Sequence, residues 1–216
     1  MTAQAGGAAP SAMKAPADRD QLRREMRARR RALTDEELRR TARQLARVAD
    51  RHRLLRPGRH IAFYFRHGAE ADLVRLMELA HKRGCVLYLP VITSYRSNRM
   101  TFQRYEPGER LRTNRYGIKE PELTGGRVAV RRLDLVFTPL LAFDLLGRRL
   151  GSGAGFYDRR LHHLRANRTW RRPRLIGVGF EFQRVHDELC PAPWDVPVDA
   201  VLTEKTLYRT RNAPKG

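Results

Sequence analysis

The chain has 216 residues, enough for one domain with a sizeable core and a tail, and its hydrophobic content of 41% is typical of a folded protein. No apolar stretch approaches the roughly 20 residues that a membrane-spanning helix needs. The only two cysteines, Cys85 and Cys190, are too few for a disulfide framework or a cysteine-rich metal site. We therefore expect a cytoplasmic protein without a membrane anchor, in which both cysteines are small buried hydrophobes.

The formal net charge of +21 points to an anionic partner without choosing among such partners. Lysine occurs at only five positions, so nearly all of the positive charge is arginine, which a bias in codon usage also produces. The densest basic run is Arg19–Arg31, and the usual interpretation of such a run is a solvated helix face. A positive field attracts nucleic acid and ATP alike, so both partners stay open.

The N-terminal part of the chain predicts a tail followed by two helices. Residues 1–18 are rich in Ala, Gly and Pro and are expected to be disordered. Apolar residues recur at helical spacing through Arg19–Leu33. The sequence Thr34–Glu37 is a capping box, which predicts that a second helix begins there, and Pro57–Gly58 ends it.

Downstream, short apolar strands alternate with helices, which predicts an α/β fold. The expected helices are 71–83, closed by Gly84, and 156–166, and the expected strands are 61–65, 86–90, 100–105, 135–138, 175–180 and 198–203. Residues 106–130 look irregular. The prediction is a single domain over 19–206, with an open, mostly parallel sheet flanked by helices, and a flexible C-terminal tail over 207–216.

The most informative segment runs from Arg149 to Asp158. Glycines stand at alternate positions 151, 153 and 155, between an apolar strand and a helix. Backbone N–H groups in such a loop form a pocket for phosphate, although a tight turn explains the glycines equally well. Arg149 can grip phosphate oxygens, and Asp158 can hold Mg²⁺ beside them or simply complement the helix dipole.

Other charged residues extend this pattern. Arg19 and Arg23 are four residues apart and can reach one anion. Asp195 and Asp199 either cap turns or contribute one carboxylate to a metal shared with Asp158. Glu70 follows an aromatic strand, which suits a flat heterocycle with N–H donors, although a helix N-cap neighbour is the simpler interpretation.

Side-chain nucleophiles are not indicated. The seven histidines show no metal-ligand spacing, and neither a Gly-x-Ser-x-Gly elbow nor a Cys–His pairing is evident. The pattern therefore argues against covalent catalysis by a side chain.

Taken in order, these segments resemble the 5-formyltetrahydrofolate cyclo-ligase, or methenyltetrahydrofolate synthetase, family over about residues 19 to 204. The most specific string is Arg149-Leu-Gly-Ser-Gly-Ala-Gly-Phe-Tyr-Asp158; the others are Leu22-Arg23, the strand-loop with Glu70, Tyr116-Gly-Ile-Lys-Glu-Pro121, Pro139-Leu-Leu-Ala-Phe-Asp144, Asp195-Val-Pro-Val-Asp199 and Thr203-Glu204. The resemblance implies a fold of the sugar-phosphate-isomerase and CoA-transferase type.

It also implies an ATP- and Mg²⁺-dependent ligase of one-carbon metabolism. The formyl oxygen of 5-formyltetrahydrofolate is phosphorylated, N10 attacks the formyl carbon, and 5,10-methenyltetrahydrofolate, ADP and phosphate are released. Such an enzyme aligns two ligands and neutralises moving charge, so it needs no nucleophile of its own. The expected partners are the folate and ATP, with no specific nucleic acid and no membrane, and the expected state is a monomer or weak homo-oligomer.

The resemblance carries roles onto matching positions. Arg149 and Asp158 are expected to be catalytic, and the Mg²⁺ ligands are Asp158 and Asp195. ATP is assigned to Arg19, Arg23, Arg149, Leu150, Gly151, Ser152, Gly153, Ala154, Gly155, Phe156 and Tyr157. The folate is assigned to Phe65, Glu70, Tyr116 and Phe156.

The chain departs from the family pattern at a few of these positions. Arg19 stands where lysine is common, Ala154 where glycine or lysine is usual, Phe156 where tyrosine is frequent, and Leu73 where threonine is frequent. These departures leave room for an altered rate or a changed substrate. Two alternatives remain: a basic nucleic-acid-binding protein on a related scaffold, and a related enzyme for sugar phosphates or CoA.

Overall fold

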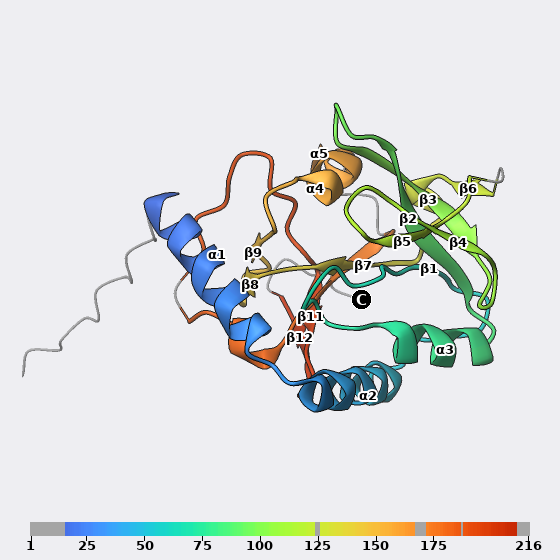
Figure 1. Cartoon of the computed structure of the whole chain (residues 1–216), viewed down its shortest axis with the longest axis horizontal. Helices are drawn as coiled ribbons and strands as arrows, with labels where there is room; N and C mark the ends of the chain where they lie inside the picture. The colour runs from blue at the N-terminus through green and yellow to red at the C-terminus, as the bar shows by residue number, and fades with distance from the viewer. Residues whose placement is uncertain (1–15, 124–125, 167–171, 187, 211–216) are drawn as a thin grey trace, which may run out of the picture.

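The centre of the molecule is an eight-stranded sheet in the order β12-β11-β10-β7-β1-β2-β3-β6 (Figure 1). The computed structural model describes residues 16–123, 126–166, 172–186 and 188–210. The strands of this sheet are β1 (His60–Ala62), β2 (Val86–Ser94), β3 (Arg99–Tyr105), β6 (Arg127–Val128), β7 (Leu135–Pro139), β10 (Arg174–Val178), β11 (Ala200–Leu202) and β12 (Leu207–Arg209).

The middle of the sheet is parallel and its edges are antiparallel. Strands β2, β1, β7, β10 and β11 run parallel to one another, whereas the pairs β2–β3, β3–β6 and β11–β12 are antiparallel. Four of the five residues of β7 are buried, because helices cover a central parallel strand on both faces. The predicted open, mostly parallel sheet flanked by helices is confirmed.

Helices α2 (Asp35–Arg51) and α3 (Val74–Lys82) cover one face of the sheet, and α4 (Phe156–Leu161) and α5 (His163–Ala166) cover the other (Figure 1). Leu45 of α2 and Leu76 of α3 belong to the larger buried cluster, and Leu161 of α4 belongs to the second. None of the helices in the described ranges is long and apolar enough to cross a membrane.

Helix α2 begins where the capping box predicts. The hydroxyl oxygen of Thr34 accepts a hydrogen bond from the backbone N–H of Glu37 at 3.2 Å, and the Glu37 carboxylate accepts one from the N–H of Thr34 at 2.8 Å. This reciprocal pair satisfies two N–H groups at the helix start that would otherwise lack partners. The helix then lays its apolar stripe on the sheet.

Helix α1 (Pro16–Arg31) lies at the side of the molecule rather than on the sheet (Figure 1). It packs beside the hairpin of β8 (Ala142–Phe143) and β9 (Arg149–Leu150), where Leu22 and Met26 are buried in a third apolar cluster. This hairpin leads directly into the glycine loop, so the packing of α1 sets the distance between the helix and the loop.

The structure corrects several of the predicted boundaries. The predicted flexible tail over 207–216 is wrong for its first residues, because Leu207–Arg209 form β12 and Leu207 is buried. The predicted N-terminal tail over 1–18 ends earlier, since α1 begins at Pro16. Residues 1–15 and 211–216 lie outside the described part of the chain.

The other differences are internal. The stretch 106–130 contains a hairpin of β4 (Leu111–Thr113) and β5 (Lys119–Pro121) in addition to β6. The single helix expected over 156–166 is two short helices, α4 and α5. The 3₁₀ turns η1 (Val130–Arg132) and η2 (Glu181–Gln183) complete the fold.

Candidate functional site

A pocket of about 830 Å³ lies where several strands of the sheet end. Tyr64 and Phe65 follow the carboxyl end of β1, Leu140 follows that of β7, and Ile92 comes from the last part of β2. Loops at the carboxyl edge of a parallel sheet are where α/β proteins bind ligands. The pocket wall includes every residue to which the sequence analysis assigned a ligand, with the exception of Leu150.

One wall of the pocket is a row of arginines on α1, which are Arg19, Arg23, Arg27 and Arg30. Arg23 Nε donates to the carbonyl of Gly151 at 3.3 Å, and Arg27 Nη2 donates to that of Ser152 at 2.9 Å. The helix thus holds the glycine loop by two guanidinium groups. The solvated-face interpretation of Arg19–Arg31 fits Arg24 and Arg31, which are exposed and do not line the pocket, but not the four arginines of this row, although Arg27 is exposed as well.

The two ends of the arginine row, Arg19 and Arg30, contact different parts of the pocket wall. Arg19 donates to the carbonyl of Cys190 at 2.7 Å and to the Asp195 carboxylate at 2.9 Å. Arg30 is 8% exposed and donates through Nε to the carbonyl of Ala69 at 2.8 Å, next to Glu70. Eleven residues of helix separate the two, which is about 16 Å at roughly 1.5 Å per residue. The row therefore spans the pocket from the 190–195 segment to Glu70.

Arg27 and Arg30 were missed in the sequence analysis, which paired only Arg19 with Arg23. The signal that identifies them is the continued spacing of four and three residues along the same helix face. Dense arginines on every side of α1 concealed this pattern.

The glycine loop presents open space to the pocket. A Cβ atom added at Gly151 or Gly153 would meet no atom within 4 Å. Gly153 and Gly155 have φ values of +107° and +69°, in the region that favours glycine. Helix α4 has only six residues, so the N–H groups of the loop itself, rather than a long helix dipole, are the feature that suits an anion.

Arg149 and Asp158 form an ion pair at the base of this loop. Arg149 Nη2 lies 2.6 Å from Asp158 Oδ1, and the two side chains are 4% and 17% exposed. Arg149 also donates to the carbonyl of Val196, and Asp158 accepts from the N–H of Val196 at 3.1 Å. These bonds fix the positive charge of Arg149 beneath the loop and join the loop to the segment after Asp195.

The predicted metal ligands, Asp158 and Asp195, both line the pocket. Each accepts hydrogen bonds through one carboxylate oxygen, and the other oxygen has no partner among the described residues. The described part of the chain holds no group of three or more His, Cys, Asp or Glu residues arranged for a metal. Two carboxylates fit Mg²⁺ when phosphate oxygens and water complete its octahedron.

Asp199 does not line the pocket. Its carboxylate accepts a hydrogen bond from the N–H of Leu175 at 2.7 Å, and burial raises the pKa of its carboxyl group. The carboxylate therefore joins the start of β10 to the segment before β11, which is a structural contact between strands and not the turn cap that the sequence suggested. Asp195 is a turn cap through the N–H of Ala192 at 2.8 Å and also a pocket residue.

The far end of the pocket is polar and largely enclosed. Glu70 accepts from the N–H of His67 at 3.0 Å, and burial raises the pKa of its carboxyl group although His67 and Arg30 oppose the shift. The hydroxyl groups of Tyr64 and Tyr157 are buried without a hydrogen-bond partner among the described residues. Burial and the charge of Glu70 raise the pKa of both tyrosines, so both hydroxyls are neutral donors.

Aromatic side chains also line the pocket. Tyr116 is 40% exposed, and its ring centroid lies 6.1 Å from that of Phe156 and 5.6 Å from that of Tyr95. Phe65, another predicted substrate residue, packs edge-on against Tyr105. The four positions assigned to the folate, Phe65, Glu70, Tyr116 and Phe156, therefore share one pocket.

Glu120 is a pocket residue to which the sequence analysis gave no role. It is 2% exposed and accepts hydrogen bonds from the N–H of Ile92, from Arg112 and from Asn114. The string Tyr116–Pro121 contains it, but an isolated glutamate in an irregular stretch gives no sign of burial. Its bonds brace the hairpin of β4 and β5 against β2.

Two smaller expectations are corrected. Leu150, assigned to ATP, is 1% exposed and packs with Leu22 and Met26 instead of facing the pocket. Its place between Arg149 and Gly151 made it look like part of the loop, but it belongs to β9. Cys85 is buried as expected, whereas Cys190 is only partly buried and lines the pocket.

The fold and the site define an α/β protein with an arginine-walled pocket for an anionic ligand. The sequence model of the 5-formyltetrahydrofolate cyclo-ligase family matches residues 15–204, and the chain belongs to this family.

Individual relatives of known name support the same family assignment. The 5-formyltetrahydrofolate cyclo-ligase of Haemophilus influenzae is 36% identical over 68% of this chain and 76% of its own length. That of Escherichia coli K12 is 34% identical over 85% of this chain and 98% of its own. The solved structure of Aquifex aeolicus 5,10-methenyltetrahydrofolate synthetase superposes with a TM-score of 0.73 at 29% identity, covering 92% of this chain and 95% of that one.

The open loop makes a prediction about two glycines. If the loop holds phosphates as the sequence predicts, Gly151→Ala lowers the affinity for Mg-ATP about tenfold, because its methyl group occupies space that a phosphate needs. The temperature of unfolding is expected to stay unchanged, because that methyl group meets no protein atom within 4 Å. Gly153→Ala is the comparison: its φ of +107° strains any L-residue, and we expect it to lower the unfolding temperature as well. Calorimetric titration and thermal melts measure both effects. An unchanged affinity in Gly151→Ala contradicts the role of the loop.

Proposed function

We propose that the pocket holds ATP and 5-formyltetrahydrofolate together and converts the folate to 5,10-methenyltetrahydrofolate, with release of ADP and phosphate. Membership of the cyclo-ligase family supports the reaction. The observation that carries the proposal is the arrangement of one continuous pocket, in which an open glycine loop backed by arginines lies next to an enclosed end with Glu70 and aromatic rings. A phosphate donor and a flat heterocyclic acceptor fit these two parts.

At the nucleotide side, we assign the phosphates to the N–H groups of the loop 151–155 and to the guanidinium groups of Arg19 and Arg23. The loop is held in place by Arg23 and Arg27, so its N–H groups are oriented before a ligand arrives. Ala154, Phe156 and Tyr157 complete the wall. Leu150 receives no role, because its side chain faces the core.

Arg149 and Asp158 are the proposed catalytic residues. The guanidinium group of Arg149 is nearly excluded from solvent, so its charge acts on the phosphates with little screening. Asp158 and Asp195 are the proposed carboxylates for Mg²⁺, which when bound neutralises charge on the phosphate oxygens. Both residues keep an oxygen free of hydrogen bonds within the described residues.

At the folate side, Glu70 accepts N–H donors of the heterocycle while Phe65, Tyr116 and Phe156 contact its rings. The formyl oxygen takes the terminal phosphoryl group, N10 attacks the formyl carbon, and that oxygen leaves as part of phosphate. The protein's contribution is to align the reacting atoms and to stabilise the charge that moves between them. No side-chain nucleophile is needed.

We further propose that the enzyme works in the cytoplasm as a monomer or weak homo-oligomer. Cys85 and Cys190 are both free thiols, which supports a reducing compartment.

The direct test of the proposed function is a coupled assay. Purified protein with Mg-ATP is expected to convert 5-formyltetrahydrofolate to a product with the absorbance of a methenyl folate, and ADP is expected to form in equal amount. Omitting either the folate or ATP abolishes both signals. If ATP is not consumed in a folate-dependent way, the proposed function is wrong.

Replacing Asp158 tests the metal role. Asp158→Asn keeps an oxygen that accepts from Arg149 and Val196 but loses the charge, so we expect turnover at a fixed Mg²⁺ concentration to fall about 10- to 100-fold and to recover partly at high Mg²⁺. Asp50→Asn is the matched control, because it breaks an Arg–Asp pair of 2.8 Å on the surface, away from the pocket. Thermal melts monitor folding of both variants. If the turnover of Asp158→Asn depends on the Mg²⁺ concentration in the same way as that of the wild type, Asp158 is not a ligand of Mg²⁺.

The raised pKa of Glu70 predicts a pH dependence of folate binding. Ionised Glu70 accepts N–H donors, and burial raises the pKa of its carboxyl group, so protonation sets in at a higher pH than for an exposed glutamate. Affinity is therefore full above that raised pKa and is lost as the pH falls through it. Glu70→Gln is expected to bind more weakly at neutral pH and to lose this acid limb, which titrations at several pH values measure. If the folate affinity of Glu70→Gln falls at low pH in the same way as that of the wild type, the group that titrates is not Glu70.

A further inference from the structure

Trp194 is the most exposed large hydrophobic residue in the described part of the chain, at 68% of its surface. The other exposed ones are Val74, Tyr116, Leu123 and Leu145. Only Trp194 and Tyr116 of this group line the pocket. Exposed indole carries a hydration cost, so its position at the rim of a ligand pocket points to a ligand that covers it.

The segment that carries Trp194 is anchored at both ends. Arg19 of α1 binds the carbonyl of Cys190 and the carboxylate of Asp195. Asp195 and Ala192 close a turn through two hydrogen bonds, one from the N–H of Asp195 at 3.0 Å and one from the N–H of Ala192 at 2.8 Å. Trp194 itself makes no hydrogen bond or ring contact with any described residue. Its backbone is fixed while its indole stays free for a ligand, which limits the entropy lost on binding.

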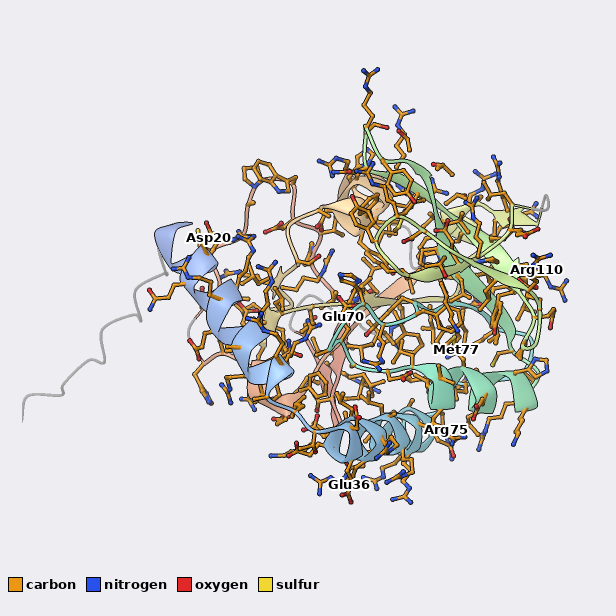
Figure 2. All side chains as sticks on the ribbon, in the orientation of Figure 1. Asp20, Glu36, Glu70, Arg75, Met77 and Arg110 are labelled. Atoms are coloured by element: carbon orange, nitrogen blue, oxygen red, sulfur yellow. The ribbon has the colours of Figure 1, made fainter. Side chains whose placement is uncertain are left out.

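The arginine row sets the order of the parts along the pocket. The 190–195 segment lies at Arg19, the loop carbonyls lie at Arg23 and Arg27, and Glu70 lies beside Arg30. In Figure 2, Asp20 marks the beginning of α1 at the side of the molecule, and Glu70 lies near the middle. The phosphate loop thus stands between Trp194 and Glu70.

This order fixes the direction of a nucleotide. The phosphoryl group that is transferred must face the folate at the Glu70 end, and the phosphates occupy the loop in the middle. The base at the opposite end of the nucleotide then points away from Glu70, toward Arg19 and the 190–195 segment. The exposed ring there is the indole of Trp194.

We propose that Trp194 stacks on the purine base of ATP, so that the nucleotide lies along α1 with its base at Arg19 and its terminal phosphate toward Glu70. The proposal rests on the proposed function and adds a base-binding residue and an orientation to it. Stacking of a base on an aromatic ring depends little on which base it is, because every base has a π-face. Trp194 therefore supplies affinity for the nucleoside part, and the loop supplies affinity for the phosphates.

The test compares two ligands with the same phosphates. Mg-ATP without folate and Mg-tripolyphosphate are titrated calorimetrically into the wild type, Trp194→Ala, Trp194→Phe and Leu145→Ala. We expect Trp194→Ala to bind ATP about tenfold more weakly and tripolyphosphate as tightly as the wild type, and Trp194→Phe to restore most of the ATP affinity. Leu145→Ala removes an exposed hydrophobic residue outside the pocket and leaves both affinities unchanged.

The outcomes separate this proposal from the proposed function. If Trp194→Ala lowers the affinities for ATP and tripolyphosphate equally, the indole only shapes the segment. If its affinity for ATP is unchanged, the base lies elsewhere. Either result overturns the stacking but leaves the phosphate site in place. A wild type that binds neither ATP nor tripolyphosphate overturns the proposed function and the stacking together. Thermal melts show that the variants are folded.

Discussion

The bonds between Arg149, Asp158 and Val196 are the constraint on which the site depends. They connect the first residue of β9, the first turn of α4 and the segment after Asp195 at a single buried guanidinium group. A positive charge kept out of water is costly unless it is paired and hydrogen-bonded, and here both conditions are met. The sheet cannot place these three segments together by itself, because each lies in a connection beyond a strand end.

The arginines of the pocket occupy two kinds of position. Arg149 is fixed inside the fold, whereas the row on α1 reaches the loop from outside through carbonyl oxygens. Arg27 and Arg30 donate to carbonyl oxygens, so no carboxylate bonded to them offsets their charge, whereas Arg19 and Arg23 are each paired with an aspartate. A share of the +21 charge is therefore concentrated at one pocket, where it favours the approach of an anionic ligand before any specific contact forms.

Local chemistry made part of the structure predictable. The capping box at Thr34–Glu37, the apolar run of β7 and the alternate glycines each depend on neighbours in the chain, and each stands where the sequence places it. The strand β12 was missed because three residues are too few to show a period, and its burial comes from pairing with β11. Leu150 and Glu120 show the same limit, since only the tertiary fold decides whether they face the core or the pocket.

Helix α1 is attached to the rest of the molecule mainly through the pocket. Apart from the apolar contacts of Leu22 and Met26 and the contact of Arg29 with the ring of Phe182, this helix is held by hydrogen bonds to segments that also form the pocket wall. Docking of the helix and occupancy of the pocket are thus thermodynamically linked, and each strengthens the other by the same free energy. A ligand bound in the pocket would hold α1 in place, and any event that loosens α1 would weaken binding throughout the pocket.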